Sequence, residues 1–514
     1  MKKKNKQRRE LHPIMSYVIL ILGVIVVSGL FSLLDLQSTY YTVSSVTHTF
    51  SPVSVNSVSL FSLSGIKYIF ANTVSNYATF TVLTHMIIIL MGISIMEKSG
   101  FLKTAITMLT KKSKKSTVTF VFVLLCILAS IMGEISYMIF IPIGALLFLY
   151  GKRNPATGII CSFAALACGS GVNFLLTSTD SSLISLTNLA AYTINKSYDI
   201  SRMGFIFIML VTVIILALVI TYVTENIITK KVPKFDFDLT LEDDEIVITN
   251  QRKKGILFAL FASTIYLIIF IYNIIPGLPL SGNLLDNTQV HYIDKLFSPE
   301  SFFSSGFVFI VTVLFVILGL FYGIGAKTIK NHEDFCKFLS HSLDGIGSML
   351  IMIFFASALI SIFKYSNIGS IIVAWFGSII GNSNFSGIPL ILLLFMFSLL
   401  SSIVLPGSIT KWTILSPTVV PTFMANGISA EFAQVIFRFA ESITMNITPF
   451  LAYFIVYFTF LEKYNQDDKF KVKFTDSIKY QLNYTGLVAF VYVAIIITWY
   501  LVGIPLGINT YPTL

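Results

Sequence analysis

Long apolar runs separated by short polar loops dominate this chain of 514 residues. A run of roughly 20 apolar residues is long enough to cross the ~30 Å hydrocarbon core of a bilayer as a helix. Nine runs reach this length, and each predicts one membrane crossing. They lie near residues 14–34, 78–97, 156–177, 203–223, 255–275, 303–324, 346–363, 432–461 and 484–504.

The composition is typical of a polytopic membrane protein. Hydrophobic residues make up 55% of the chain and charged residues 12%, whereas soluble domains average about 25% charged residues. A net charge of +10 would indicate an acidic partner in a soluble protein, but here the basic residues cluster in short loops. This pattern favours the lipid bilayer, and not nucleic acid, as the partner. The run at 14–34 is too long for a signal peptide and predicts a retained first helix.

The basic loops predict the orientation, because lysine and arginine concentrate in short cytoplasmic loops. The basic segments are the N-terminal tail, 98–115, 230–254, 327–337 and 463–479. The segments poor in basic residues are 35–77, 276–302 and 365–387, and the first two have room for short interfacial helices. We therefore expect a cytoplasmic N-terminus and an external C-terminus. The polar stretch 232–254 predicts a cytoplasmic linker between two halves, 1–231 and 255–514.

Residues 116–150 are apolar but have basic residues at both ends. A single straight helix of this length would measure about 52 Å, so the segment must bend back. The break is expected at "SIMGEIS", where Gly133 weakens the helix and Ser130, Glu134 and Ser136 are polar. The spacing allows two minimal crossings or a re-entrant hairpin whose tip stops inside the membrane. A re-entrant tip is tolerated only where it is buried in protein or lines a watery cavity.

The same pattern recurs at 388–424, around the polar break "LPGSITKW". Tyr137 and Pro142 correspond to Trp412 and Pro417 at one common offset, and Asn173 echoes Asn446 at nearly the same offset. The flanks of the second segment lack lysine and arginine, so it enters from outside. The repeat therefore favours the re-entrant interpretation and an inverted topology, in which substrate and ions bind near the midplane at broken helices.

We therefore expect an all-α polytopic membrane protein. It has about nine transmembrane helices and two opposed re-entrant hairpins, at 116–150 and 388–424. "GLFYG" at 319–323 is a small-residue motif and a weak indication of dimerisation.

Two long stretches resemble the AbgT family of bacterial transporters. They are "KRNPATGIICSFAALACGSGVNFLLTSTD" at 152–180 and "KWTILSPTVVPTFMANGISAEFAQVIFRFAESITMNITPFLAYF" at 411–454. The resemblance implies transport of p-aminobenzoyl-glutamate, or antimetabolite efflux in some members, by a homodimer in the bacterial inner membrane. It also implies roles for Asn173 and Asp180. The chain departs from the family pattern at Gly133-Glu134, in 406–412 and at Glu441, which leaves the substrate open.

Asp180 is an ionisable residue that follows a long apolar run, and it is expected at membrane depth. Such a group costs about 2.5 to 3.5 kcal/mol on insertion scales and is a functional candidate by default. With Asn173, Thr177 and Ser178 it could supply oxygens to Na⁺ or carry a coupled proton. The alternative is an aspartate that caps a helix at the outer surface.

Arg438 and Glu441 lie three residues apart, and on a helix they share a face. A guanidinium can hold a substrate carboxylate through two hydrogen bonds. The alternative is a structural ion pair within one helix. An incoming carboxylate could also compete with Glu441 for the arginine.

Ser408, Thr410 and Trp412 belong to the second tip, where hydroxyls can bind a ligand and the indole can stack on an aryl ring. Trp412 could instead be an interfacial anchor, and the side chain of Lys411 is long enough to snorkel to the surface.

The helix at 430–461 is expected to break at Asn446, Thr448 and Pro449, which frees carbonyls for an ion, or merely to kink there. The first tip offers Glu134 as an ion-coupling residue. The expected substrate site consists of the second tip together with Asn173, Asp180, Arg438, Glu441 and Pro449.

The resulting hypothesis is a secondary active transporter for an aromatic or amino-acid-like anion, coupled to Na⁺ or H⁺. The alternatives are an efflux pump of the same fold and a membrane-embedded enzyme. The chain has no H-E-x-x-H, G-x-S-x-G or Walker A motif, so we expect neither catalysis nor ATP hydrolysis. The histidines are scattered, so we expect no cofactor and no resident metal beyond a transient Na⁺.

Overall fold

A computed structural model describes residues 12–44, 47–111, 113–173, 176–235, 248–298, 300–464 and 472–514. Its elements up to the middle of the chain are α1 (Pro13–Leu33), β1 (Gln37–Val43), β2 (Phe50–Asn56), α2 (Leu63–Ala78), α3 (Thr81–Lys98), α4 (Phe101–Thr110), α5 (Lys115–Leu128), α6 (Ile135–Tyr150), α7 (Pro155–Gly169), α8 (Ser178–Tyr192), α9 (Ile206–Val223) and α10 (Thr229–Lys231).

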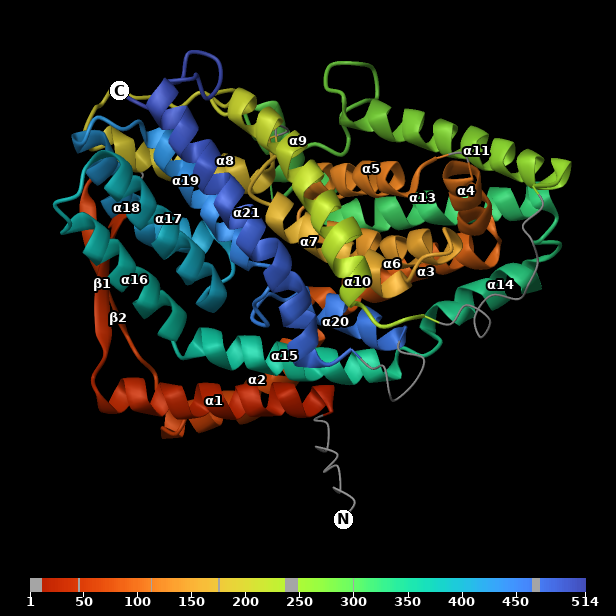
Figure 1. The fold of residues 1–514 in the computed structure, drawn as a ribbon, viewed down its shortest axis with the longest axis horizontal. Helices are drawn as coiled ribbons and strands as arrows, with labels where there is room; N and C mark the ends of the chain where they lie inside the picture. Colours follow the sequence, from red (N-terminus) through yellow and green to blue (C-terminus); the bar gives the residue numbers. More distant parts are fainter. Residues whose placement is uncertain are drawn as a thin grey trace.

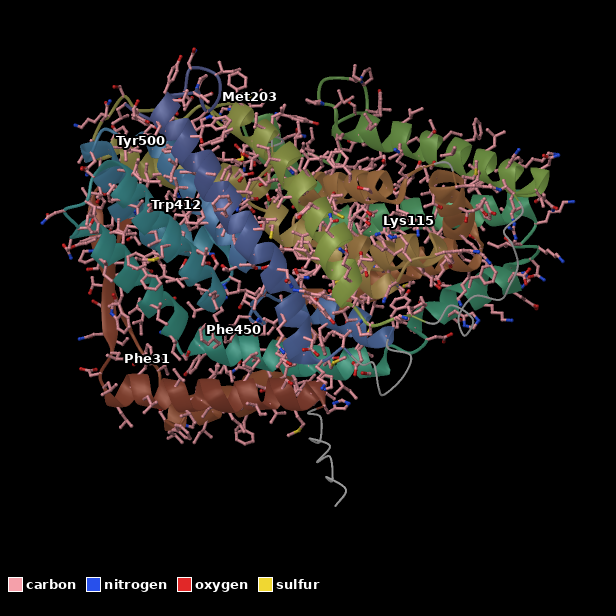
Figure 2. The ribbon with its side chains drawn as sticks, in the orientation of Figure 1. Phe31, Lys115, Met203, Trp412, Phe450 and Tyr500 are labelled. Atoms are coloured by element: carbon pink, nitrogen blue, oxygen red, sulfur yellow. The ribbon has the colours of Figure 1, made fainter. Side chains whose placement is uncertain are left out.

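The remaining elements are α11 (Asn250–Ile274), α12 (Tyr292–Phe297), α13 (Phe302–Ala326), α14 (His332–Ser340), α15 (Gly347–Tyr365), α16 (Ile368–Gly381), α17 (Gly387–Val404), α18 (Ser408–Ala425), α19 (Ala430–Thr444), α20 (Phe454–Lys463) and α21 (Phe474–Val502). Most of 232–254, the predicted linker, lies outside the described residues. Side chains fill the spaces between the helices (Figure 2).

Within the described ranges, nine helical stretches are long and apolar enough to cross a membrane. Seven coincide with predicted crossings. The predictions at 156–177 and 432–461 are wrong, because α7 stops at Gly169 and the other run breaks between α19 and α20. Their places are taken by Lys115–Met132 and Gly387–Val404, the first arms of the two predicted hairpins.

The two halves have corresponding elements in the same order. One shift along the chain carries both bounds of α7 onto those of α19, and also carries the last residue of α6 onto the last residue of α18. A slightly smaller shift carries the first residue of α4 onto the first residue of α16. The helix bounds therefore repeat with the offset seen in the sequence. The division at 231 and 255 stays a prediction.

Packing between the halves is reciprocal. Helix α1 packs on α15 and α13 packs on α3, so one long helix of each half lies against the other half. Figure 1 shows α1 and α15 side by side along the lower edge of the molecule. The small-residue motif at 319–323 is used inside the chain, because a Cβ on Gly319 would lie 2.7 Å from the backbone of Ile95 in α3.

Both predicted hairpins are helix–break–helix units. In the first, a short 3₁₀ turn (Ala129–Met132) is followed by Gly133 at φ +60°, and α6 begins two residues later. In the second, Leu405, Pro406 and Gly407 separate the arms, with Gly407 at φ +126°. A positive φ favours glycine, which explains both breaks. Helix α6 is about 24 Å long at 1.5 Å per residue, shorter than the bilayer core. That the tips end inside the bilayer stays a prediction.

Several segments predicted as loops contain structure. Strands β1 and β2 form an antiparallel hairpin within 35–77, where threonine, tyrosine and valine favour extended backbone. Helix α16 occupies most of 365–387, and α4 lies within the basic segment 98–115. These two helices have 14 and 10 residues, and they were missed because both are too short for the length criterion of a crossing.

Candidate functional site

Four breaks in helices meet inside the molecule. They are the two hairpin tips, 129–134 and 405–407, and the unwound segments that follow α7 (from 170) and α19 (445–453). Tyr453 donates a hydrogen bond to Glu134 (3.0 Å), which links the second unwound segment to the first tip. Helices α7 and α19 are buried along their whole length. The polar groups that helix breaks expose are therefore gathered in one place.

Each unwound segment is tied to the nearest hairpin by an equivalent hydrogen bond. The side-chain amide of Asn173 donates to the carbonyl of Leu128 (3.1 Å), and the hydroxyl of Thr448 donates to the carbonyl of Ile403 (2.6 Å). The shift that relates α7 to α19 carries both the donor and the acceptor of the first bond onto those of the second. Structurally, Asn173 therefore corresponds to Thr448 and not to Asn446, its counterpart in the sequence echo. Asn173 also donates to Ser130 (3.0 Å).

Arg438 is the centre of a buried cluster of charges. One Nη atom lies 3.1 Å from Asp180, and the other lies 2.6 Å from Glu441 and 3.0 Å from the hydroxyl of Ser408. The guanidinium also donates to the carbonyl of Ser170 (2.6 Å), in the first unwound segment. Its Nε atom is buried and has no hydrogen-bond partner among the residues that the structure describes. Arg438 thus connects α19 to the first unwound segment, to the start of α8 and to the second tip.

Lys411 completes this cluster, which contradicts the expectation that its side chain reaches the surface. Its ammonium lies 3.0 Å from Glu441, and both side chains are 0% exposed. It also contacts the hydroxyl of Ser402 in α17. Burial of a lysine is tolerated where an opposite charge pairs with it. The two cations and the two carboxylates, Asp180 and Glu441, cancel, so the cluster has no net charge.

Asp180 combines the two roles that the sequence left open. Its carboxylate accepts from the backbone and hydroxyl of Thr177 (3.2 and 2.6 Å) in a capping box at the start of α8. The same carboxylate pairs with Arg438, and its side chain is only 14% exposed. It therefore caps a helix in the interior and not at the outer surface.

The residues of the second tip separate into two groups. Ser408 is buried against Arg438, whereas Thr410 is exposed and lies outside the charge cluster. Trp412 is fully buried, stacks on Phe437 and donates to Thr187 in α8 (2.8 Å). Full burial excludes the role of interfacial anchor for Trp412.

The remaining predicted residues lie around the cluster rather than in it. Asn446 is buried and contacts Gln481 and Thr485 in α21. Pro449 is half-buried in the break between α19 and α20, where its missing N–H prevents a continuous helix. Thr187, Gln481, Thr485 and Tyr453 were not singled out from the sequence. They are ordinary polar residues within helical runs, and only the fold shows their contacts.

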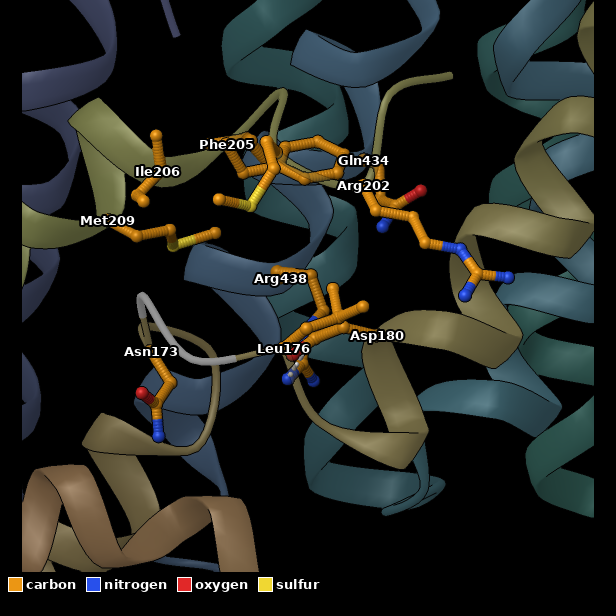
Figure 3. A pocket seen from close by; sticks show the side chains of 11 residues that line it. Asn173, Leu176, Asp180, Arg202, Phe205, Ile206, Met209, Gln434 and Arg438 are labelled. Atoms are coloured by element: carbon orange, nitrogen blue, oxygen red, sulfur yellow. Dashed lines mark ion pairs between the residues drawn. The ribbon is translucent and has the colours of Figure 1, made fainter. Parts of the chain in front are cut away.

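A small cavity reaches this cluster. Its volume is about 50 Å³, and the residues that line it include Asn173, Asp180, Arg202, Gln434 and Arg438 (Figure 3). Ligand pockets usually measure about 300–1,000 Å³, so this conformation is closed around the cluster. A cavity of about 660 Å³ lies between β1, α16 and α18, but the residues that line it are uncharged. The larger cavity offers no counter-charge for an anion.

A sequence model of the AbgT putative transporter family matches residues 9–514. The chain belongs to this family. It is 25% identical over 504 residues to the p-aminobenzoyl-glutamate transport protein of Escherichia coli strain K12, covering 98% of this chain and 94% of that protein. It is therefore a multi-pass membrane protein of a transporter family, and membership favours transport over catalysis.

Two solved structures are also similar. The Alcanivorax borkumensis YdaH transporter, described as having an unusual topology, has a TM-score of 0.48 and 22% identity, covering 97% of this chain and all of its own. Neisseria gonorrhoeae MtrF, described as illuminating a class of antimetabolite efflux pumps, has a TM-score of 0.48 and 24% identity, with 98% of both chains covered.

Proposed function

We propose that this chain is a secondary transporter that carries p-aminobenzoyl-glutamate or a related aromatic amino-acid-like anion, with Arg438 as the group that holds the substrate carboxylate. The observation that supports this most strongly is the buried, neutral cluster of Arg438, Lys411, Asp180 and Glu441 where the four helix breaks meet. Intramembrane charges are costly and usually mark a transport pathway. A guanidinium suits a carboxylate because its donors form a planar fork.

Competition between carboxylates provides a coupling mechanism. Glu441 keeps Lys411 as a partner when it loses Arg438. A substrate carboxylate that takes the place of Asp180 on Arg438 instead leaves Asp180 without a cation, and an unpaired buried charge is strongly unfavourable. The displaced carboxylate therefore takes up a cation, either H⁺ or Na⁺. Substrate and cation then occupy the site together, which is the requirement for coupled transport. Asn173, Thr448 and Glu134 supply neighbouring oxygens that suit a small cation.

The contacts support the proposed orientation. Three contacts each join two segments that are predicted to be external: Arg202–Asp294, Ser429–Tyr511 and Asn367–Asn56. Three other contacts each join two segments at the predicted cytoplasmic side: Arg153–Glu225, Asn154–Pro233 and Thr328–Ser99. Because basic residues concentrate on the cytoplasmic side, we propose a cytoplasmic N-terminus and an external C-terminus. We also propose a homodimer, as the family resemblance implies.

Uptake into proteoliposomes tests this function. Labelled p-aminobenzoyl-glutamate is supplied under an imposed Na⁺ gradient, an imposed pH gradient or neither. We expect one gradient to drive accumulation, and Asp180→Ala and Arg438→Ala to abolish it. Lys196→Gln, which changes an exposed residue of the loop before α9, is the matched control. Accumulation without a gradient, or unaltered uptake by both variants, would rule out the proposed mechanism.

A further inference from the structure

Arg202 lines the same small cavity as Arg438, but its charge is directed elsewhere. Its guanidinium donates to Asp294 (2.9 Å) in α12, and the two side chains are about one-third exposed. Figure 3 shows the guanidinium of Arg202 pointing away from Arg438 and Asp180. The cavity therefore has a second cation at its outer rim, which is held outward by an aspartate from a distant part of the chain.

Asp294 lies in α12, in the segment before α13, whereas Arg202 lies in the loop before α9. The backbone N–H of Asp286 donates to the carbonyl of Lys295 (2.9 Å), and the carboxylate of Asp286 accepts from Ser298 (2.6 Å). These bonds hold α12 in the segment that leads into α13, and α12 packs on both α13 and α8. Asp294 also accepts from Ser181, the residue after Asp180 (2.8 Å). The carboxylate of Asp294 thus joins the segment before α13 to Arg202, which precedes α9, and to Ser181 in α8.

We propose that Arg202 is a second anchor for an anionic substrate, and that Asp294 holds it outward while the cavity is closed. Release from Asp294 frees the guanidinium to turn into the cavity and opens the outer end. Two arginines at opposite ends of one site match a ligand with two carboxylates, and p-aminobenzoyl-glutamate has two. This inference rests on the proposed function, since it assigns the substrate class of the same site.

Substrates that differ in one charge test the anchor. Arg202→Gln is expected to raise the KM for p-aminobenzoyl-glutamate at least tenfold and to change the KM for p-aminobenzoyl-glutamine, which has one carboxylate, less than twofold. Asp294→Asn is expected to lower the KM for the dicarboxylate two- to tenfold, because a competing carboxylate is gone. Lys196→Gln should change neither. Equal effects of Arg202→Gln on both substrates, or no effect on either, would overturn the proposal.

A charge swap separates an anchor from a structural ion pair. Arg202→Asp combined with Asp294→Arg restores the pair but leaves no cation at position 202. The KM for the dicarboxylate should therefore stay raised, whereas recovery of the wild-type KM would show that Arg202 acts only through the pair.

Thiol labelling tests the closure without any transport. A Leu176→Cys reporter lines the cavity, and Cys336→Ser removes the exposed native thiol. Labelling by an impermeant reagent from outside should rise at least fivefold in Arg202→Gln and in Asp294→Asn, and return toward the wild-type rate in the charge swap. Unchanged labelling in both single variants would contradict the closure. If wild-type protein carries no p-aminobenzoyl-glutamate, the proposed function fails, and this assay still decides whether the pair closes the cavity.

Discussion

Arg438 and Asp180 come from opposite halves of the chain and meet 3.1 Å apart in the interior, where their side chains are 5% and 14% exposed. Both side chains are largely shielded from water, so Asp180 depends on Arg438, and Arg438 depends on Asp180 and Glu441. The pair links the start of α8 in the first repeat to α19 in the second. A ligand that separates the pair removes one of the contacts between the two repeats.

Loss of Arg438 alone is expected to destabilise the protein. Arg438→Gln leaves Asp180 and one oxygen of Glu441 buried without the cation, and breaking a buried pair costs about 3–5 kcal/mol. Arg438→Gln combined with Asp180→Asn removes one charge of each sign and keeps the Lys411–Glu441 pair, so the cluster stays neutral. The double variant should therefore unfold at a higher temperature than the single variant in a thermal scan in detergent. An equal or lower unfolding temperature would contradict a charge-balanced cluster.

The closest backbone approach to the cluster is at Gly171. A Cβ added there would lie 2.2 Å from the carbonyl oxygen of Arg438, so the unwound segment or α19 must move. Gly171→Ala is expected to cost about 1–3 kcal/mol through overpacking and to reduce transport at least tenfold. Gly23→Ala in α1 is the control, because nothing lies within 4 Å of its added Cβ. Wild-type transport by Gly171→Ala would show that this contact is not required.

The hydrogen bond from Thr448 to Ile403 is expected to hold the second tip in place. Thr448→Val keeps the shape of the side chain but removes the bond to Ile403, at a cost of about 1 kcal/mol. Thr413→Val removes a bond within α18, to Ile409, and is the matched control. We expect Thr448→Val to raise the rate of hydrogen exchange at the second tip, 404–408, and Thr413→Val to leave it unchanged. Equal exchange rates in the two variants would argue against a tether.

The contact between Asp294 and Arg202 should resist acid. Burial raises the pKa of Asp294. Hydrogen bonds from Ser181 and Arg202, together with the charges of Arg202 and His291, lower it by more than burial raises it, so the pKa lies below its ordinary value. A carboxylate with a lowered pKa stabilises the contact fully above the ordinary value of about 3.9 and loses this effect as the pH falls through the lowered value.

A distance between two spin labels tests this pH dependence. Labels on Lys196→Cys and Glu300→Cys should report the same distance at pH 8 and pH 5, whereas Asp294→Asn should broaden the distance distribution at both pH values. A distribution that broadens at pH 5 in the otherwise unaltered protein would contradict the lowered pKa.

Much of the architecture could be predicted because membrane crossings need long apolar runs and breaks need unusual residues. Gly133 and Gly407 marked the hairpin breaks, and the spacing of Arg438 and Glu441 predicted their contact. The break after Gly169 was missed because hydropathy does not distinguish a helix from an unwound segment of small residues. Lys411 was expected to reach the surface because its charged partner, Glu441, lies on another helix and 30 residues further along the chain. The rule that intramembrane charges are paired could have found it.

Equilibrium binding to the double variant tests the central claim most directly. Arg438→Gln combined with Asp180→Asn keeps the cluster neutral and keeps the Lys411–Glu441 pair, so a loss of binding is not explained by an unpaired buried charge. The purified double variant should unfold within a few degrees of the wild-type protein and show no saturable binding of labelled p-aminobenzoyl-glutamate, while the wild-type protein binds it. Binding by the folded double variant with the wild-type Kd would contradict the assignment of Arg438 as the group that holds the substrate.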